Sequence, residues 1–377
     1  MGTYGQDLEF FASRNIGVIE LLGKDGKARV LLVPAFQGRV MTSTAEGPGG
    51  QSFGWINRNA VSEGFVNPRF NPFGGEERFW IGPEGGPFSW YFKHGEEQVF
   101  ANWDVPAFID SEPFEVESAT PDEAIFTKET TLWNASGNEF HIGVRMVVKL
   151  LTDNEIAADL GVSLPPSVRV VGYSTANTLV NLGPAPWTKE TGMPSVWLLG
   201  MYPPTPSTVV FIPYDKSCSG RIVKDDYFGA LPPGRLIVRD GMVYFKIDGK
   251  LRSKIGLPAG SAKDICGSHD PVAGTLTILK YTLPEGAPDY VNSQWGPQDD
   301  PFHGDVINSY NDGPTETGEI MGPFYEIETS SPAAALAPGQ TLTHTQRTYH
   351  FQGVPEDLQT IARTVFGADL NEVASAF

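Results

Sequence analysis

A regular alternation of apolar and polar side chains between Glu139 and Leu150 is the feature that most constrains the fold. Apolar residues occupy every second position from Phe140 onward, while polar residues such as His141 and Arg145 fall between them. Because neighbouring side chains of a β-strand point to opposite faces, this pattern predicts a long strand with one buried and one polar face. Glycine (42) and proline (31) make up about a fifth of the chain, which favours many strands joined by turns over long helices.

Most of the remaining chain has the composition of short strands separated by turns. A hairpin is predicted from strands at 17–22 and 28–34, and an aromatic strand is predicted at 87–93. The other predicted strands are 124–133, 156–162, 167–173, 178–182, 196–200, 208–213, 235–238, 242–247, 274–282, 306–310, 323–329 and 341–351. Only Pro355–Phe366 has a clear helical spacing of apolar residues, and a short helix is also predicted from Asp7 to Ser13.

So many strands in one chain require closure or layering, because exposed strand edges pair with other molecules. We therefore predict a single all-β domain over residues 1–377. Its architecture would be a sandwich of two or more large, mostly antiparallel sheets with few short helices. A propeller is the alternative, but its blades would give a fixed sequence period, and none is visible.

The stretch from Asn71 to His94 concentrates acidic, basic and aromatic side chains between paired glycines. Its glycines and prolines predict a shaped loop rather than a helix. Its polar and aromatic candidates for binding are Glu77, Arg78, Trp80 and Glu84. Carboxylates and a guanidinium hydrogen-bond hydroxyl groups, and flat rings cover the C–H faces of a pyranose. The stretch therefore indicates either a sugar pocket or a structural cluster of arginine and glutamate under an aromatic core.

The net charge of −18 argues against a nucleic acid or an anionic membrane as partner, because phosphate binding relies on clustered Lys and Arg. No apolar run reaches the length of a membrane span. The first residues lack the basic and apolar regions of a signal peptide, which fits either a cytoplasmic protein or an exported, periplasmic one whose leader has been removed. Cys218 and Cys266 are the only cysteines, and their redox state stays open.

Four segments carry a resemblance to known families: VPAFQGR at 33–39, FGGEERFWIGPEGG at 73–86, YSTANTLVNLG at 173–183, and GPFYEIE at 322–328 followed by LAPGQTL at 336–342. Together they resemble an uncharacterised bacterial family, many of whose members are exported by gut-type bacteria. More distantly, the chain is similar to the galactose mutarotase superfamily, whose fold is a β-supersandwich.

The resemblance to aldose 1-epimerases implies an acid–base pair. In those enzymes a histidine protonates the ring oxygen of the sugar, and a glutamate near the C-terminus removes the proton of the anomeric hydroxyl. Glu326 matches that glutamate, and Glu328 shares its face because the two are separated by one residue of a strand. The position of the histidine falls on Asn177, whose amide cannot act as a general acid near neutral pH.

Two histidines are candidates for the missing acid. His94 lies at the end of the central stretch, and His303 lies in a second aromatic and acidic loop at 295–305. Each could instead have a purely structural role. The pair His94-Gly95 ahead of Trp103 resembles hexose-phosphate epimerases of the superfamily, but Gln98 stands where their arginine is expected. The acids near His303 would suit Ca²⁺ better than Zn²⁺ but match no calcium loop, so no metal is predicted.

Further binding candidates lie outside the central stretch: Asn177, Trp187, Asn311 and Glu328. Trp187 is chosen because it lies in a proline-rich loop, where tryptophan faces a ligand more often than it does in mid-strand. His344 and His350 share one strand face with Gln346, and that face is predicted to be polar and exposed.

These observations predict a carbohydrate-active protein, similar to aldose 1-epimerases, that moves protons on a sugar in a pocket on one concave face. Such chemistry requires no cofactor. Lyase or hydrolase chemistry on the same fold would use the same residues. The alternative from another class is a non-catalytic glycan-binding protein, favoured by Asn177 at the histidine position. The chain has no GxSxG, P-loop or dinucleotide-binding pattern. The expected partner is a sugar or oligosaccharide, and the oligomeric state is not specified.

Overall fold

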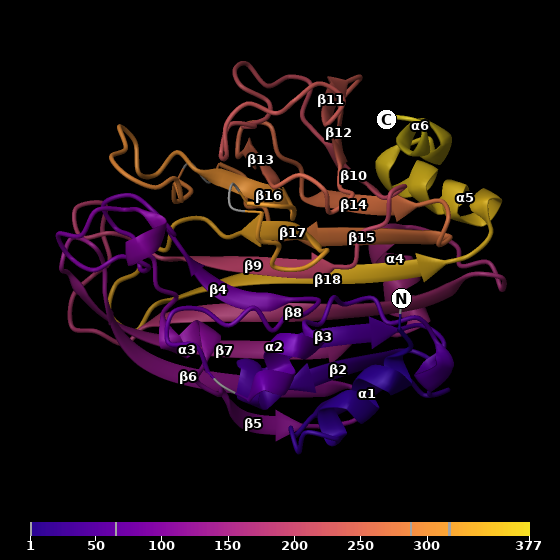
Figure 1. Cartoon of the computed structure of the whole chain (residues 1–377), viewed down its shortest axis with the longest axis horizontal. Coiled ribbons are helices and arrows are strands. Elements are labelled where there is room, and N and C mark those ends of the chain that lie inside the picture. Colours follow the sequence, from indigo (N-terminus) through magenta and orange to yellow (C-terminus); the bar gives the residue numbers. More distant parts are fainter. Residues whose placement is uncertain (1, 65, 287–288, 316–317) are drawn as a thin grey trace.

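The strands of this protein form three antiparallel sheets in a computed structural model that describes residues 2–64, 66–286, 289–315 and 318–377 (Figure 1). The largest sheet has ten strands in the order β11-β12-β10-β14-β15-β18-β8-β7-β6-β5. Its strands are β5 (Glu115–Ala119), β6 (Glu123–Trp133), β7 (Glu139–Leu150), β8 (Arg169–Asn181), β10 (Val209–Pro213), β11 (Leu236–Arg239), β12 (Met242–Lys246), β14 (Ile265–Asp270), β15 (Thr275–Tyr281) and β18 (Thr341–Gln352).

Two smaller sheets complete the sandwich. The five-stranded sheet has the order β13-β16-β17-β9-β4, and the three-stranded sheet has the order β1-β2-β3. The five strands are β4 (Arg78–Gly82), β9 (Ser195–Tyr202), β13 (Ser253–Pro258), β16 (Asp305–Asn311) and β17 (Tyr325–Ser330). The three strands are β1 (Ile19–Leu22), β2 (Arg29–Val33) and β3 (Arg39–Thr44).

The helices are short, and Figure 1 shows α5 and α6 beside the strands of the large sheet. They are α1 (Tyr4–Ala12), α2 (Arg58–Glu63), α3 (Ala107–Asp110), α4 (Asp153–Leu160), α5 (Pro355–Phe366) and α6 (Leu370–Ala374), with 3₁₀ turns at Pro34–Phe36, Gly47–Gly49 and Phe100–Asn102. Among the described residues, no helix is long and apolar enough to cross a membrane.

The hydrophobic core lies between the large sheet and the two smaller ones. Ile81 and Leu198 of the five-stranded sheet pack in one cluster with Val144 and Leu179 of the ten-stranded sheet. The opposite face of the large sheet is covered in part by α5, whose Leu358 belongs to a cluster on that side. Because its inner face is used by the core, the five-stranded sheet presents its other face to the covering loops, and polar side chains gather there.

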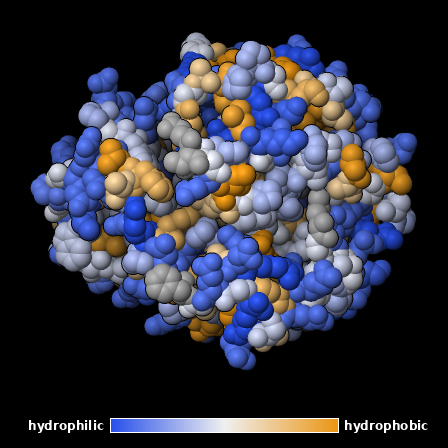
Figure 2. Space-filling view, in the orientation of Figure 1, coloured by the Kyte–Doolittle hydropathy of each residue, from blue (hydrophilic) through white to orange (hydrophobic). Residues whose placement is uncertain are grey.

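The predicted sandwich of large antiparallel sheets with few short helices is confirmed. β7 and α5 begin and end at the predicted residues, and the hairpin at 17–34 is present as β1 and β2. The two strands predicted at 167–173 and 178–182 are one strand, β8. Figure 2 shows that the face seen in Figure 1 is mostly hydrophilic, with hydrophobic residues in small patches, which fits the net charge of −18.

Two predicted strands are absent. The segment at 156–162 forms most of helix α4 rather than a strand, because Thr152 and Glu155 form a capping box that starts the helix. The aromatic segment at 87–93 is not a strand. Its side chains anchor it instead: Trp90 Nε1 donates to the carbonyl of Gly82 at 2.8 Å, and the Tyr91 hydroxyl donates to the carbonyl of Ile81 at 2.9 Å.

The histidine face of β18 is buried, whereas the alternation had predicted it to be exposed. His344, Gln346 and His350 are all at most 1 % exposed, because this face of the large sheet is covered by the smaller sheets. Gln346 donates to Glu77 at 2.6 Å, and His350 lies 2.9 Å from Glu76. Period-two spacing marks two faces but does not decide which one is covered.

Candidate functional site

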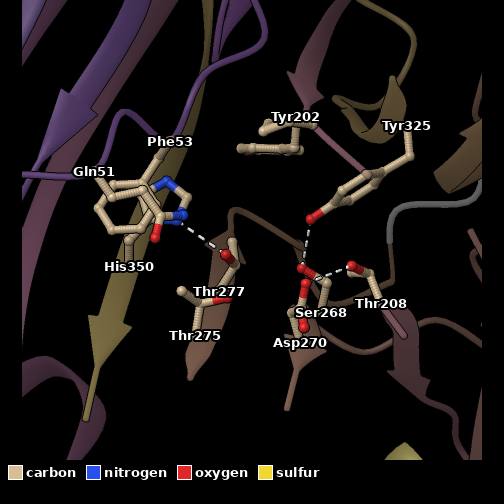
Figure 3. Close-up of a pocket in the computed structure, with 11 residues that line it drawn as sticks. Gln51, Phe53, Tyr202, Thr208, Ser268, Asp270, Thr275, Thr277, Tyr325 and His350 are labelled. Carbon is tan, nitrogen blue, oxygen red and sulfur yellow. Dashed lines mark hydrogen bonds between the residues drawn. The ribbon is translucent and has the colours of Figure 1, made fainter. Parts of the chain in front are cut away.

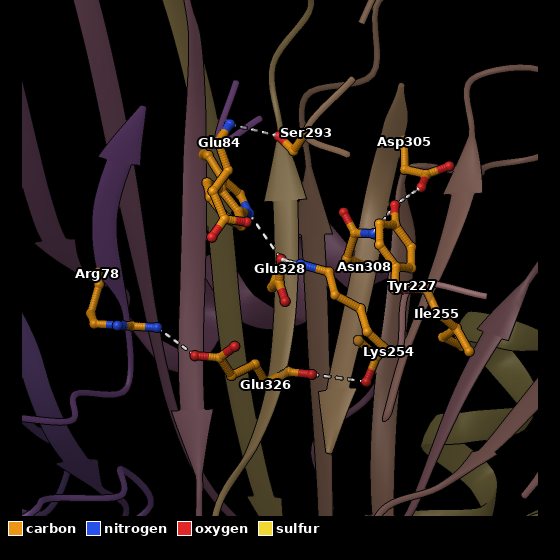
Figure 4. A network of polar contacts seen from close by, with 12 residues as sticks. Arg78, Glu84, Tyr227, Lys254, Ile255, Ser293, Asp305, Asn308, Glu326 and Glu328 are labelled. Atoms are coloured by element: carbon orange, nitrogen blue, oxygen red, sulfur yellow. Dashed lines mark hydrogen bonds and ion pairs between the residues drawn. The ribbon is translucent and has the colours of Figure 1, made fainter. Parts of the chain in front are cut away.

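A group of charged side chains lies on the outer face of the five-stranded sheet (Figure 4). Glu326 and Glu328 project from β17 on the face opposite Ile327, which is in the core. Arg78 comes from β4 at one edge of the sheet, and Lys254 comes from β13 at the other edge. The sheet thus brings together four charged groups that are far apart in the sequence.

These groups form two ion pairs. Arg78 donates to Glu326, and Lys254 Nζ lies 2.8 Å from Glu328 Oε2. The indole of Trp197 also donates to Glu328 Oε2 at 2.9 Å. The exposed fraction is 3 % for Arg78, 7 % for Glu326 and 1 % for Glu328, so the charges are almost fully removed from water.

A third carboxyl group adjoins the pairs. Glu84, in the loop after β4, accepts a hydrogen bond from Trp103 Nε1 at 3.0 Å. Burial raises the pKa of Glu84, and the nearby Lys254 opposes this while Glu328 adds to it. Burial disfavours the charge of Lys254, but the carboxylates of Glu328 and Glu84 outweigh that effect and raise its pKa. The site therefore holds three carboxyl groups and two cations.

Among the carboxyl groups of this site, Glu326 has a pKa that is raised toward neutral pH. Burial raises its pKa to about 7, the Arg78 guanidinium opposes the shift, and the Glu328 carboxylate reinforces it. A carboxyl group with this pKa can accept and release a proton at the same pH, which is what general acid–base catalysis requires.

Each of the two cations lies over the ring of a tryptophan. The guanidinium of Arg78 lies 5.0 Å from the ring of Trp80, and Lys254 Nζ lies 5.0 Å from the ring of Trp197. The two rings contact each other edge to face at 5.6 Å. Such cation–π contacts fix the long basic side chains in place.

Several buried polar atoms of the site have no hydrogen-bond partner among the described residues: Arg78 Nε, Trp80 Nε1 and Glu328 Oε1. Buried polar groups in folded proteins are nearly always hydrogen-bonded. Two donors and one acceptor are thus free for water or for the hydroxyl groups of a ligand.

A tyrosine from a long loop closes one side of the site. Tyr227 donates to the carboxylate of Asp305, and Asn308 Nδ2 donates to the Tyr227 hydroxyl at 3.1 Å. Lys254 Nζ lies 5.5 Å from the Tyr227 ring. Burial raises the pKa of Asp305, although Tyr227 and the neighbouring lysines oppose this.

The structure brings together five of the residues that the sequence singled out: Arg78, Trp80, Glu84, Glu326 and Glu328. It places four others elsewhere. Glu77 points between the sheets, and Asn177 is fully buried there with its amide donating to Thr175 at 3.1 Å. Trp187 is buried against Phe140, with ring centres 5.7 Å apart. Asn311 is fully buried and bonds the backbone at Gly249 and Leu251.

Neither candidate histidine joins the charged group through any contact of the described residues. His94 is exposed, and its Nδ1 lies 2.9 Å from the carbonyl of Ala135. His303 is exposed beside Phe302. The roles given to them from the sequence stay predictions without a structural contact to support them.

Sequence reasoning missed Lys254 and Tyr227. Lys254 lies on β13, a strand that was not predicted, so its side chain could not be assigned to a face. Tyr227 lies in an irregular loop, and no spacing rule connects it to Asp305. The one sequence signal for Lys254 was its position between Ser253 and Ile255, at the start of the short segment 253–258.

A second buried polar cluster lies between the sheets, beside a small cavity (Figure 3). The cavity has a volume of about 30 Å³ and is lined by His350, Phe53, Tyr325 and Asp270 among others. His350 stacks on Phe53 with ring centres 4.3 Å apart. The volume suits one or two water molecules but no sugar. The outer face of the five-stranded sheet is therefore the better candidate for binding a ligand.

Within the described part of the chain, no group of three His, Cys, Asp or Glu side chains is arranged to hold a metal ion. Cys218 and Cys266 are both free thiols, and Cys266 is buried.

The sequence profile of a family of unknown function (DUF6786) matches residues 2–377. No curated relative matches the chain. A galactose mutarotase-like protein from Lactobacillus casei ATCC 334 has a similar structure, with a TM-score of 0.53 at 10 % identity over 89 % of this chain and 100 % of that one.

Two other solved structures are similar to the same degree. An aldose 1-epimerase candidate from Escherichia coli K12 gives a TM-score of 0.51 at 12 % identity, covering 90 % of this chain and 100 % of that one. The Slr1438 protein from Synechocystis sp. PCC 6803 gives 0.52 at 14 % identity, covering 90 % and 96 %. At these identities the likeness shows the fold, a galactose mutarotase-like β-sandwich.

Proposed function

Since the chain belongs to the family of unknown function DUF6786, we propose a function from its own site: acid–base chemistry on a sugar, of the aldose 1-epimerase type. The observation that carries the proposal is the buried Glu326, held by Arg78 beside Glu328 and Lys254, with a pKa of about 7. The free polar atoms of Arg78 and Trp80 support it, because sugar hydroxyl groups would satisfy them.

Two carboxyl groups can supply the acid and the base. Glu326 accepts the proton of the anomeric hydroxyl, and Glu84, whose pKa burial raises, donates its proton to the ring oxygen. The bond between the anomeric carbon and the ring oxygen breaks and leaves an aldehyde. Ring closure on the other face reverses both proton transfers, so the two carboxyl groups return to their starting states.

The neighbouring residues keep these protonation states in place. Arg78 orients Glu326 through their ion pair, and Lys254 compensates the charge of Glu328. Without Lys254, three carboxyl groups would share the site with one cation, and repulsion would shift all of their pKa values upward.

A second candidate is a non-catalytic glycan-binding protein. It is favoured by Asn177 at the expected histidine position, and by the exposed His94 and His303, which make no contact with the charged group among the described residues. A binding protein would hold the sugar without converting it, whereas catalysis by Glu326 would interconvert the anomers.

The test is a search for turnover by proton NMR with freshly dissolved α-anomers and with oligosaccharides. We expect faster anomer exchange that rises as the pH increases through about 7, because Glu326 must be ionised to act as base. Glu326→Gln should lower this rate by about a hundredfold or more. Glu139→Gln, an exposed glutamate on β7, is the matched control. Chain cleavage would indicate a lyase or hydrolase, and binding without any turnover would refute the epimerase.

A further inference from the structure

The charged site is closed to a ligand as long as the segments that cover it stay in place. Glu328 is 1 % exposed, yet its Oε1 atom has no hydrogen-bond partner among the described residues. Arg78 is 3 % exposed, and its Nε atom also lacks a partner in the described part of the chain. A sugar that bonds to these atoms must displace part of the covering chain, so one of the covering segments has to move.

Two loops contribute residues to the site, and they differ in how firmly they are held. The loop after β4 is anchored by aromatic side chains that are at most 8 % exposed: Trp90, Tyr91, Phe92 and Trp103. The long loop between β10 and β11 contributes Tyr227. Among the described residues at 214–234 of that loop, Val223 alone is buried. A segment with so few buried contacts opens at low cost, so the second loop is the one that can move.

The part of this loop that contacts the site is a strap, residues 224–229, along the edge of the five-stranded sheet. Lys224 and Gly256 of β13 exchange both of their backbone hydrogen bonds, at 2.7 and 2.8 Å, so the strap begins as a short extension of the sheet edge. Gly220 before the strap and Gly229 at its end have positive φ, and a Cβ added at either would meet no atom within 4 Å. The backbone is therefore free to change direction at both positions.

Tyr227 fastens the strap to the sheet beside the charged groups (Figure 4). Its hydroxyl donates to Asp305 and accepts from Asn308 Nδ2 at 3.1 Å. Asn308 stands directly opposite Glu328 in the pairing of β16 with β17, so both side chains project from the same face. Burial and the charge of Asp305 raise the pKa of Tyr227, so the hydroxyl keeps the proton that it donates. The strap is thus fastened one strand away from Glu328.

The ring of Tyr227 also packs on the ion pair of Lys254 with Glu328. Lys254 Nζ lies 5.5 Å from the ring of Tyr227 and 5.0 Å from the ring of Trp197. The same Nζ lies 2.8 Å from Glu328 Oε2, and the side chain of Lys254 is 12 % exposed. Trp197 belongs to the sheet, whereas Tyr227 belongs to the strap. Movement of the strap therefore removes one of the two rings on Lys254 and leaves the other in place.

We propose that the strap is a gate over the charged site. It opens as a unit when Tyr227 releases Asp305, and the opening admits a ligand to Lys254 and Glu328. The choice of a sugar as that ligand rests on the proposed function. The opening itself does not depend on the chemistry that follows, so it can be measured on the protein alone.

The test measures opening and access separately, without any sugar. Hydrogen–deuterium exchange, read by mass spectrometry with fragmentation, follows the amides of Lys224 and Gly256, which are bonded to each other's carbonyl groups. Reductive methylation with formaldehyde and cyanoborohydride follows access to Lys254. Lys93, whose side chain is 76 % exposed, is the internal reference for that reaction.

Three variants separate the fastening of the strap from general effects. Tyr227→Phe removes the hydroxyl and keeps the ring. Asp305→Asn keeps an acceptor but removes its charge, which weakens the hydrogen bond. Tyr214→Phe is the matched control, because Tyr214 lies at the start of the same loop and its hydroxyl makes no hydrogen bond with any described residue. Circular dichroism verifies that each variant is folded.

We expect Tyr227→Phe to accelerate exchange at both amides by about tenfold, and Asp305→Asn by about threefold. Methylation of Lys254 relative to Lys93 should rise by the same factors, because both measurements report the population in which the strap is open. Tyr214→Phe should change neither rate. Exchange in Tyr227→Phe equal to that of wild type would overturn the proposal, and so would faster exchange without faster methylation of Lys254.

These outcomes are distinct from those that decide the proposed function. If exchange and methylation rise together in Tyr227→Phe but wild type converts no sugar, the gate stands and the epimerase fails. If sugar conversion depends on Glu326 but Tyr227→Phe leaves exchange and methylation unchanged, the epimerase stands and the gate fails.

Discussion

Replacing Glu77 by glutamine would measure the energetic cost of a carboxyl group buried between two sheets. Glu77 is 4 % exposed, and Gln346 Nε2 donates to it at 2.6 Å. Burial raises its pKa from 4.5 to about 7, although hydrogen bonds from Thr175 and Gln346 oppose the shift. Between these two values the folded protein binds more protons than the unfolded chain, so stability falls as the pH rises from 4.5 to 7.

The magnitude follows from the difference in pKa. A change from 4.5 to about 7, at about 1.4 kcal/mol per pKa unit, corresponds to about 3 kcal/mol. Glutamine has nearly the same shape and does not ionise, so the variant lacks this pH dependence. Any hydrogen bond that the glutamine amide gains or loses alters the free energy of unfolding equally at every pH. It therefore cancels from the difference between pH 4 and pH 8. The stability of Glu77→Gln relative to wild type should therefore increase by about 3 kcal/mol between pH 4 and pH 8.

Urea unfolding followed by tryptophan fluorescence at pH 2, 4, 6 and 8 would test this. Glu155→Gln is an informative control, because hydrogen bonds from Lys149 and Thr152 lower the pKa of that half-buried carboxyl to about 2. Its ionised form stabilises the folded state, so this variant should lose stability relative to wild type as the pH rises from 2 through 4.5. Stability curves of Glu77→Gln and wild type that run parallel from pH 4 to 8 would refute the burial argument.

Two further predictions concern other buried charges. Lys254→Met should destabilise the protein by about 3 kcal/mol or more, because it leaves Glu328 buried without its cation; a urea unfolding midpoint equal to that of wild type would contradict this. Burial lowers the pKa of His344 from 6.5 to about 3, so its contribution is complete above pH 6.5 and is lost as the pH falls toward 3. In the same assay, the free energy of unfolding of His344→Gln should therefore fall by about 3 kcal/mol less than that of wild type between pH 7 and pH 4. An equal fall in variant and wild type would show that His344 is not the group being protonated.

The direction of one hydrogen-bond chain shows which nitrogen of the His344 ring carries the proton. Thr329 donates to Gln346 at 2.8 Å, and Gln346 donates to Glu77 at 2.6 Å. Because the Thr329 proton is used in this way, His344 Nε2 must donate to Thr329, which it approaches at 2.9 Å. The polar interior between the sheets is thus an ordered network rather than a set of isolated buried groups.

Local sequence patterns were sufficient to predict the strands and helices that show a clear spacing of apolar residues. The alternation in Glu139–Leu150 gave β7, and the spacing of Leu358 and Ile361 gave α5. The pairing of Glu326 with Glu328 on one strand face also follows from period two alone. Where the local signal was ambiguous the prediction failed: the capping box at Thr152 outweighed an apolar run that could have been a strand.

The sequence by itself determined which residues alternate, which segments turn and that Glu326 and Glu328 share a face. Only the tertiary structure decided what those faces meet. Arg78 reaches Glu326 across 248 positions of the chain, and Lys254 reaches Glu328 across 74. Such partners are chosen by the order of strands in the sheet, which no local spacing encodes. The same physical reason buries His350 and brings Glu326 to a pKa near 7, because desolvation depends on the layer packed above a strand and not on the strand itself.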